Sequence, residues 1–133
     1  MGKVGTIKYE EKIMSKFKKY LPWAVIVLLA LPMMMAGAAK LAGVPEMHQS
    51  FVMLGLPDWF GYFIGAAELA GGIALFVSRL SALAATGLIP IMAGAVYFHI
   101  AFAIPSAVPA AIFLVLSLVV IALKRRQAIW YPV

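Results

Sequence analysis

The chain has 133 residues, of which 65% are hydrophobic and only 12% are charged. A soluble domain carries about 25% charged residues, so this chain has too few to cover a water-facing surface, and we expect a membrane protein with one domain. The absence of cysteine excludes disulfides, thiolate metal sites and iron–sulfur clusters. The formal net charge of +6 needs a separate explanation.

Two apolar stretches in the first part of the chain are long enough to cross a bilayer, which takes about 20 helical residues. The first is residues 20–39, which carry no formal charge and follow a lysine-rich segment. The second is residues 59–78, which follow Pro57 and Asp58 as a helix start and contain one ionisable residue, Glu68. We therefore predict a transmembrane helix in each stretch.

A third apolar stretch, residues 80–123, would be roughly 66 Å long as a single helix. No bilayer is that thick, so the stretch must reverse direction. The proline-containing segment 104–109 is the place where it can do so, which gives spans at residues 82–103 and 107–123. The predicted fold class is all-α, a four-transmembrane-helix bundle that comprises residues 20–123.

Nearly all basic residues fall in segments that an even number of spans places on one side of the membrane. They are Lys3, Lys8, Lys12, Lys16, Lys18, Lys19, Arg79, Lys124, Arg125 and Arg126. Because cytoplasmic segments are enriched in Lys and Arg, we expect a multi-pass protein of the inner or plasma membrane with both termini cytoplasmic. Residues 1–19 are then a basic tail or an amphipathic surface helix, and residues 124–133 are a C-terminal tail. Topology and anionic lipid account for the charge, so the expected partner is the lipid bilayer and not nucleic acid.

Glu68 is predicted near the bilayer midplane, because about ten residues separate it from each end of its span. A carboxyl group at that depth costs on the order of a few kcal/mol, so we expect it to face the bundle or a cavity. Gly61, Gly65 and Gly72 share its helix face and permit close packing. Two alternatives stay open: Glu68 handles a proton, or it is an interhelical hydrogen-bond clasp.

Other polar residues are expected to form a funnel that opens outward above Glu68. Helical rise places Lys40 and His99 roughly 12 Å above Glu68, which argues against direct contact. The alternative for Lys40 is snorkelling to the interface, and the alternative for His99 is packing there. Further candidates are the residues expected at the mouth or able to supply hydroxyls: Glu46, His48, Asp58, Tyr62 and Tyr97.

Metal and haem sites have little support in the sequence. His48 and His99 would suffice for bis-histidine ligation, but neither lies in a haem motif, so we expect no haem and no covalently bound cofactor. Combining them with Glu46 and Asp58 gives no metal-ligand spacing, so no metal site is predicted. Motifs of soluble enzymes such as the P-loop and the nucleophile elbow are missing, and whether the chain is an enzyme stays open.

Three short segments follow one another in an order that a known family shares. They are residues 36–41 (Ala-Gly-Ala-Ala-Lys-Leu), 51–57 (Phe-Val-Met-Leu-Gly-Leu-Pro) and 65–72 (Gly-Ala-Ala-Glu-Leu-Ala-Gly-Gly), with His99 late in the third span. Over residues 20–123 the chain resembles the DoxX and DoxX-like family of small four-helix membrane proteins. The resemblance implies a four-helix bundle and, from named members, association with thiosulfate:quinone oxidoreductase or related quinone-linked systems. By family position, Lys40, Glu68 and His99 are candidate site residues.

Three functions are compatible with the sequence. The first is a component that binds a quinone or another small molecule and associates with a larger membrane redox complex, since an apolar cleft with a few polar groups suits a quinone. The second is a non-catalytic accessory or structural subunit of a larger membrane protein complex. The third is a small transporter or lipid-handling protein, which would require a homo-oligomer because four spans are few for alternating access.

Overall fold

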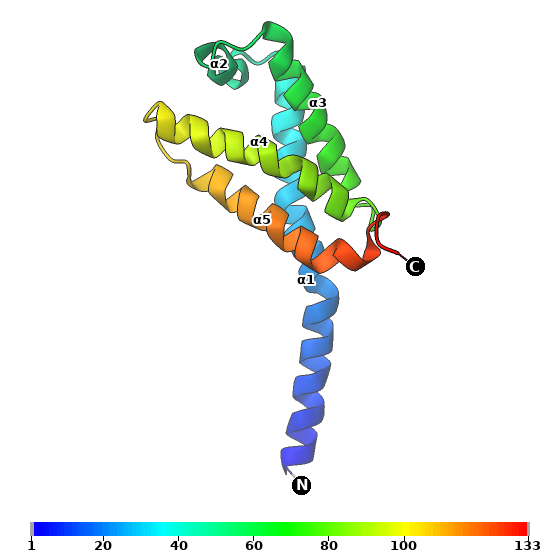
Figure 1. The fold of residues 1–133 in the computed structure, drawn as a ribbon. Helices are drawn as coiled ribbons and strands as arrows, with labels where there is room; N and C mark the ends of the chain where they lie inside the picture. The colour runs from blue at the N-terminus through cyan, green and yellow to red at the C-terminus, as the bar shows by residue number, and fades with distance from the viewer. Residues whose placement is uncertain (1, 133) are drawn as a thin grey trace.

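The computed structural model describes residues 2–132, and no strand occurs within that range. The helices are α1 (Gly2–Leu41), α2 (Pro45–Met53), α3 (Asp58–Ala74), α4 (Ser81–Ala101) and α5 (Val108–Lys124), followed by the short 3-10 helix η1 (Arg125–Gln127) (Figure 1). The predicted all-α class is therefore confirmed.

Within the described residues, three helices are long and apolar enough to cross a membrane: α1, α4, and α5 with its extension to Gln127. They match the first, third and fourth predicted spans. Helix α3 lies in the second predicted span but has 17 residues. Its predicted end at residue 78 is wrong, because residues 75–80 form turns closed by bonds such as Leu80 N to Val77 O at 2.8 Å.

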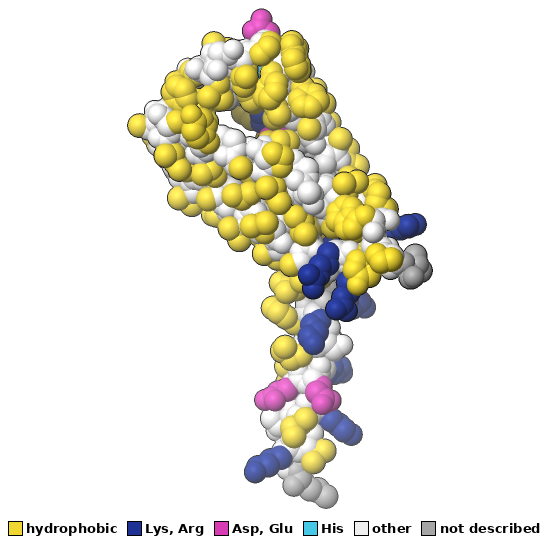
Figure 2. Space-filling view, viewed as in Figure 1, with side chains coloured by type: hydrophobic (Ala, Val, Ile, Leu, Met, Phe, Trp, Pro, Cys, Tyr) yellow, Lys and Arg dark blue, Asp and Glu magenta, His cyan; other side chains and the backbone are white. Residues whose placement is uncertain are grey.

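Helix α1 is much longer than the predicted span. It begins at Gly2, and residues 2–20 are exposed and project away from the other helices (Figure 1). Lys and Arg side chains gather on this projection and where it meets the bundle (Figure 2). Residues 2–19 are thus helical and continuous with the first span, and how they sit against a membrane stays a prediction.

The connection between the first two spans contains a helix that the sequence did not reveal. Helix α2 begins with Pro45 in its first turn, a position where proline is favoured because the missing N–H has no intrahelical partner. Gly43 and Gly55 flank α2 with φ angles of +78° and +71°, which glycine adopts without strain. His48, expected at the mouth of the funnel, therefore lies on a helix of its own.

Helices α1 and α3 pack antiparallel and so closely that glycine is required between them. A Cβ atom on Gly37 would lie 2.6 Å from both the carbonyl oxygen of Gly65 and the amide nitrogen of Leu69. A Cβ atom on Gly72 would lie 3.1 Å from the carbonyl oxygen of Ala30. The small-residue face predicted for the second span therefore forms the contact with α1.

Helix α4 packs mainly against α5 and touches α3 near only one end. A Cβ atom on Gly71 would lie 3.4 Å from Leu88, so the two helices are in contact at this level. Beyond it, α4 diverges from α3 toward its C-terminal end (Figure 1). Gly87 and Gly94 of α4 have nothing within 4 Å of a built Cβ atom, so the space in front of them is open.

Candidate functional site

A cavity of about 1080 Å³ lies between α2, α3 and α4. Figure 2 shows a hollow in this part of the molecule with a basic side chain inside it. Most of its wall is apolar, including Phe60, Phe63, Ile64, Ile91, Ala95 and Phe98. Its polar lining residues are Lys40, Glu46, Gln49, Ser50, Glu68 and His99. Apolar walls with a few polar groups are typical of sites for small organic ligands.

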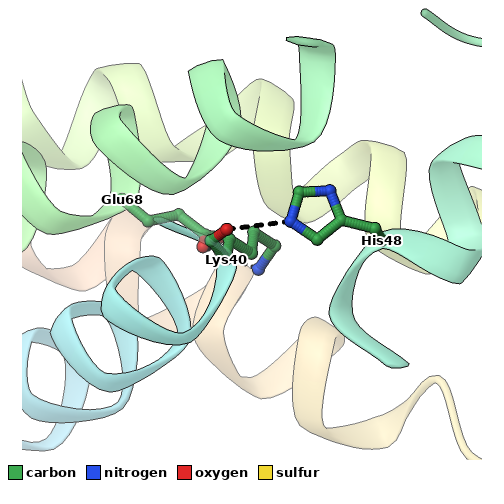
Figure 3. Close-up of polar contacts among 3 residues, drawn as sticks. All are labelled: Lys40, His48 and Glu68. Atoms are coloured by element: carbon green, nitrogen blue, oxygen red, sulfur yellow. Dashed lines mark hydrogen bonds and ion pairs between the residues drawn. The ribbon is translucent and has the colours of Figure 1, made fainter. Parts of the chain in front are cut away.

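Lys40 and Glu68 form a buried ion pair at the edge of this cavity, with 2.7 Å between Nζ and Oε2 (Figure 3). Lys40 is 9% exposed and Glu68 is 3% exposed. Glu68 therefore faces both the α1–α3 interface and the cavity, as expected. Removing one partner of such a pair leaves an uncompensated buried charge, which is strongly destabilising.

The expectation that Lys40 lies too far from Glu68 for contact is wrong. A Cβ atom on Gly65 would lie 2.7 Å from that of Lys40, so Lys40 is level with Gly65, about 4.5 Å of helical rise from Glu68. Helical side chains lean toward the N-terminus of their own helix, so in antiparallel helices these two lean toward each other. The prediction used only the helical rise between residues and did not include this lean or the length of the lysine side chain.

His48 joins α2 to the end of α1. Its Nε2 lies 2.8 Å from the carbonyl oxygen of Lys40, and since a carbonyl only accepts, Nε2–H is the donor (Figure 3). The ring centroid of His48 lies 4.6 Å from that of Tyr62. The ring also occupies the place that a side chain on Gly61 would need. His48 thus serves as a contact between α1, α2 and α3.

The single predicted funnel is replaced by two cavities. A smaller one, of about 340 Å³, is lined by His48, Asp58 and Tyr62. Glu46 lines the larger cavity from the first turn of α2. Tyr97 is 64% exposed and lines neither of them. The mouth residues therefore divide because α2 lies between the two spaces.

His99 lines the larger cavity from the last turn of α4. Its Nδ1 is buried and has no hydrogen-bond partner within residues 2–132. A neutral imidazole has one N–H donor and one acceptor nitrogen, so with its proton on Nε2 His99 offers a donor to the cavity. His99 makes no hydrogen bond to the Lys40–Glu68 pair.

Five cavity residues of α2 were missed by sequence reasoning: Met47, Gln49, Ser50, Phe51 and Met53. They were missed because no helix was expected there. A signal exists in the sequence, since the stretch from Pro45 to Leu54 has a proline at its start and no further proline or glycine before Gly55.

The part of the chain that the structure describes contains no group of three His, Asp or Glu residues that could hold a metal ion. His48 and His99 line different cavities, so the structure does not bring the two histidines to one haem site.

The sequence model of the DoxX-like family matches residues 24–122, which begin near the middle of α1 and reach almost to the end of α5. Lys40, Glu68 and His99 all lie within the matched region. No curated protein and no solved structure matches the chain. The match covers most of the 133 residues and confirms the resemblance seen in the sequence. The chain therefore belongs to the DoxX-like family.

Proposed function

We propose that this chain binds a quinone, or a small molecule of similar chemistry, in the larger cavity and works with a membrane redox partner. The observation that carries the proposal is a cavity of about 1080 Å³ whose walls are apolar and whose edge holds a buried ammonium–carboxylate pair. A quinone has the matching features, an apolar ring and two carbonyl oxygens that accept hydrogen bonds. The cavity is large enough for such a ring.

Each polar residue has a distinct role in this proposal. His99 donates a hydrogen bond from Nε2 to one carbonyl oxygen, and the Lys40 ammonium group donates to another acceptor on the ligand. Glu68 holds Lys40 in place and holds or relays a proton when the ligand is reduced. The sequence contains no cysteine, so thiol and iron–sulfur relays within the chain are excluded, and we assign the supply of electrons to the partner protein.

The proposal includes four membrane spans with both termini in the cytoplasm. Support comes first from the basic residues, which gather at one end of the molecule (Figure 2). Further support comes from α3, whose buried Glu68 forms an ion pair with Lys40 of the long helix α1. Because the chain lacks cysteine, single Ser106→Cys and Gln127→Cys variants, both at exposed positions, report topology directly. An impermeant thiol reagent applied outside should label the first and spare the second. The reverse pattern would overturn the orientation.

Ligand binding is tested with the protein in nanodiscs and a short-chain benzoquinone as the probe. His99→Phe keeps an aromatic ring but removes the donor, and loss of one hydrogen bond of about 1.4 kcal/mol weakens binding about tenfold. Tyr97→Phe on the same helix is the matched control, because Tyr97 is exposed and lines neither cavity. Wild-type binding that His99→Phe does not change, or no saturable binding at all, would contradict the proposal.

One observation favours a second function, that of an accessory subunit. Gly87 and Gly94 lie seven residues apart on α4 and face open space, and small residues of this kind let a helix of another protein approach closely. Purification in mild detergent separates the two functions. A stoichiometric larger membrane protein without quinone favours the accessory subunit, and extractable quinone in the isolated chain favours the ligand-binding component.

A further inference from the structure

We infer that α2 is a hinged cover over the larger cavity and that His48 is the positioning residue that holds it closed. This inference rests on the proposed function, because it states how a ligand gains access to the Lys40–Glu68 pair. The first observation is the share of the cavity wall that α2 provides. Its six lining residues are Glu46, Met47, Gln49, Ser50, Phe51 and Met53.

Helix α2 is held to the rest of the molecule less firmly than the other helices. None of its nine residues is buried, whereas every other α-helix has at least four buried residues. Gly43 and Gly55 lie just outside its two ends with positive φ angles. Glycine at such positions absorbs a change in backbone direction with little strain, which is the property of a hinge. The helix can therefore move as a unit.

The His48 side chain provides the one polar attachment. Within residues 2–132, its contact with the carbonyl oxygen of Lys40, at 2.8 Å, is the only side-chain hydrogen bond that links α2 to another helix. The acceptor belongs to the same residue whose ammonium group pairs with Glu68. Lys40 therefore anchors α2 through its carbonyl oxygen and pairs with Glu68 through its ammonium group (Figure 3).

Aromatic contacts of α2 with α3 lie close to His48. The His48 ring packs over Gly61 and next to Tyr62, and the ring of Phe51 lies 5.7 Å from that of Phe60. All of these contacts lie in the first two turns of α3, away from the glycine contacts of Gly37 and Gly72 between α1 and α3. Movement of α2 therefore opens the cavity without separating α1 from α3.

The test uses the full-length chain with a His48→Cys/Gly61→Cys pair, since a side chain on Gly61 would reach the position of the His48 ring. In the reduced form, this variant lacks the His48 hydrogen bond that holds α2 closed. In the oxidised form, a disulfide locks α2 to α3. The readout is the rate at which a small uncharged acylating reagent modifies the Lys40 amine, measured by peptide mass spectrometry. We expect at least a tenfold slower modification in the oxidised form, reversed by a reductant. The single His48→Cys variant should show the fast rate with or without oxidant.

A second pair of variants separates loss of the hydrogen bond at position 48 from loss of folding. His48→Gln retains an N–H donor and should keep Lys40 protected, whereas His48→Ala should expose it at the rate of the reduced double variant. Equal rates for the oxidised and reduced forms, or failure of the two cysteines to cross-link, would overturn the inference. Lys40 modification needs no quinone, so a protected Lys40 together with no benzoquinone binding would reject the proposed ligand and leave the cover standing.

Discussion

Helix α3 lies beside both α1 and α4, and glycine serves opposite purposes on these two sides. Toward α1, the glycines remove side chains so that backbones touch, as the 2.6 Å separations at Gly37 show. Toward α4, Gly87 and Gly94 also remove side chains, but nothing fills the space in front of them. The difference teaches that glycine in a membrane helix marks close packing only where a second backbone approaches; elsewhere it makes room.

The Lys40–Glu68 pair lies where these two regions meet. Its carboxylate comes from the face of α3 that packs on α1, and both residues line the cavity on the α4 side. The close α1–α3 contact (the closed interface) therefore gives the charged pair rigidity, and the open space between α3 and α4 (the open wedge) gives a ligand room beside it. Variants can therefore be directed at the closed interface, at the charged pair on the boundary, or at the open wedge.

The largest effect is expected from Glu68→Leu, which leaves the Lys40 ammonium group buried without its partner. Breaking a buried pair in this way costs about 3 kcal/mol or more. The loss should appear as reduced thermal stability in detergent. Lys40→Met combined with Glu68→Leu should recover most of that stability, because an apolar pair of similar volume carries no uncompensated charge. A single variant as stable as the wild type would show that the pair is not desolvated.

Gly37→Ala should break the closed interface. The added methyl group meets backbone atoms of Gly65 and Leu69, which cannot rotate away, so α1 and α3 must separate. Overpacking of this kind costs about 2 kcal/mol, measurable as a lower unfolding midpoint in detergent. A neutral result would mean that the two helices are not held at the distance described.

Glu68→Gln separates charge from shape at the boundary between the regions. The amide oxygen still accepts a hydrogen bond from Lys40 but carries no charge, so the ammonium group loses its counter-charge and we expect a loss of stability of about 2 kcal/mol, smaller than that of Glu68→Leu. Partner-linked quinone reduction should fall while the protein remains folded, because the amide cannot carry a proton as the carboxyl does. Unchanged reduction activity and ligand content would leave Glu68 as a packing clasp.

The smallest change is expected from Gly94→Ala in the open wedge. The methyl group meets nothing, and alanine favours a helix over glycine by up to about 1 kcal/mol, so the unfolding midpoint should stay or rise slightly. The same substitution type thus has opposite signs at Gly37 and Gly94. A clear loss of stability at Gly94 would show that the wedge is closed in the membrane.

Much of the fold follows from the sequence because hydropathy and glycine spacing are local signals. The reversal near residue 105 and the small-residue packing face of α3 were predicted correctly for that reason, although the sequence did not indicate that α1 is the helix this face meets. The contact of Lys40 with Glu68 was not, because it depends on the register of two helices and on the lean of their side chains. Helix α2 was missed because nine residues with little apolar periodicity give a weak signal.

The most direct test of the ligand cavity is to fill it from α4. Gly94→Leu projects into the open space, whereas Ala93→Leu changes the next residue, which is exposed and does not line the cavity. Binding of a short-chain benzoquinone is measured for both variants in nanodiscs, with the unfolding midpoint as a check on folding. We predict that both variants stay folded, that Ala93→Leu binds like the wild type, and that Gly94→Leu binds at least about tenfold more weakly. Equal binding by the two folded variants would contradict a ligand site in this cavity.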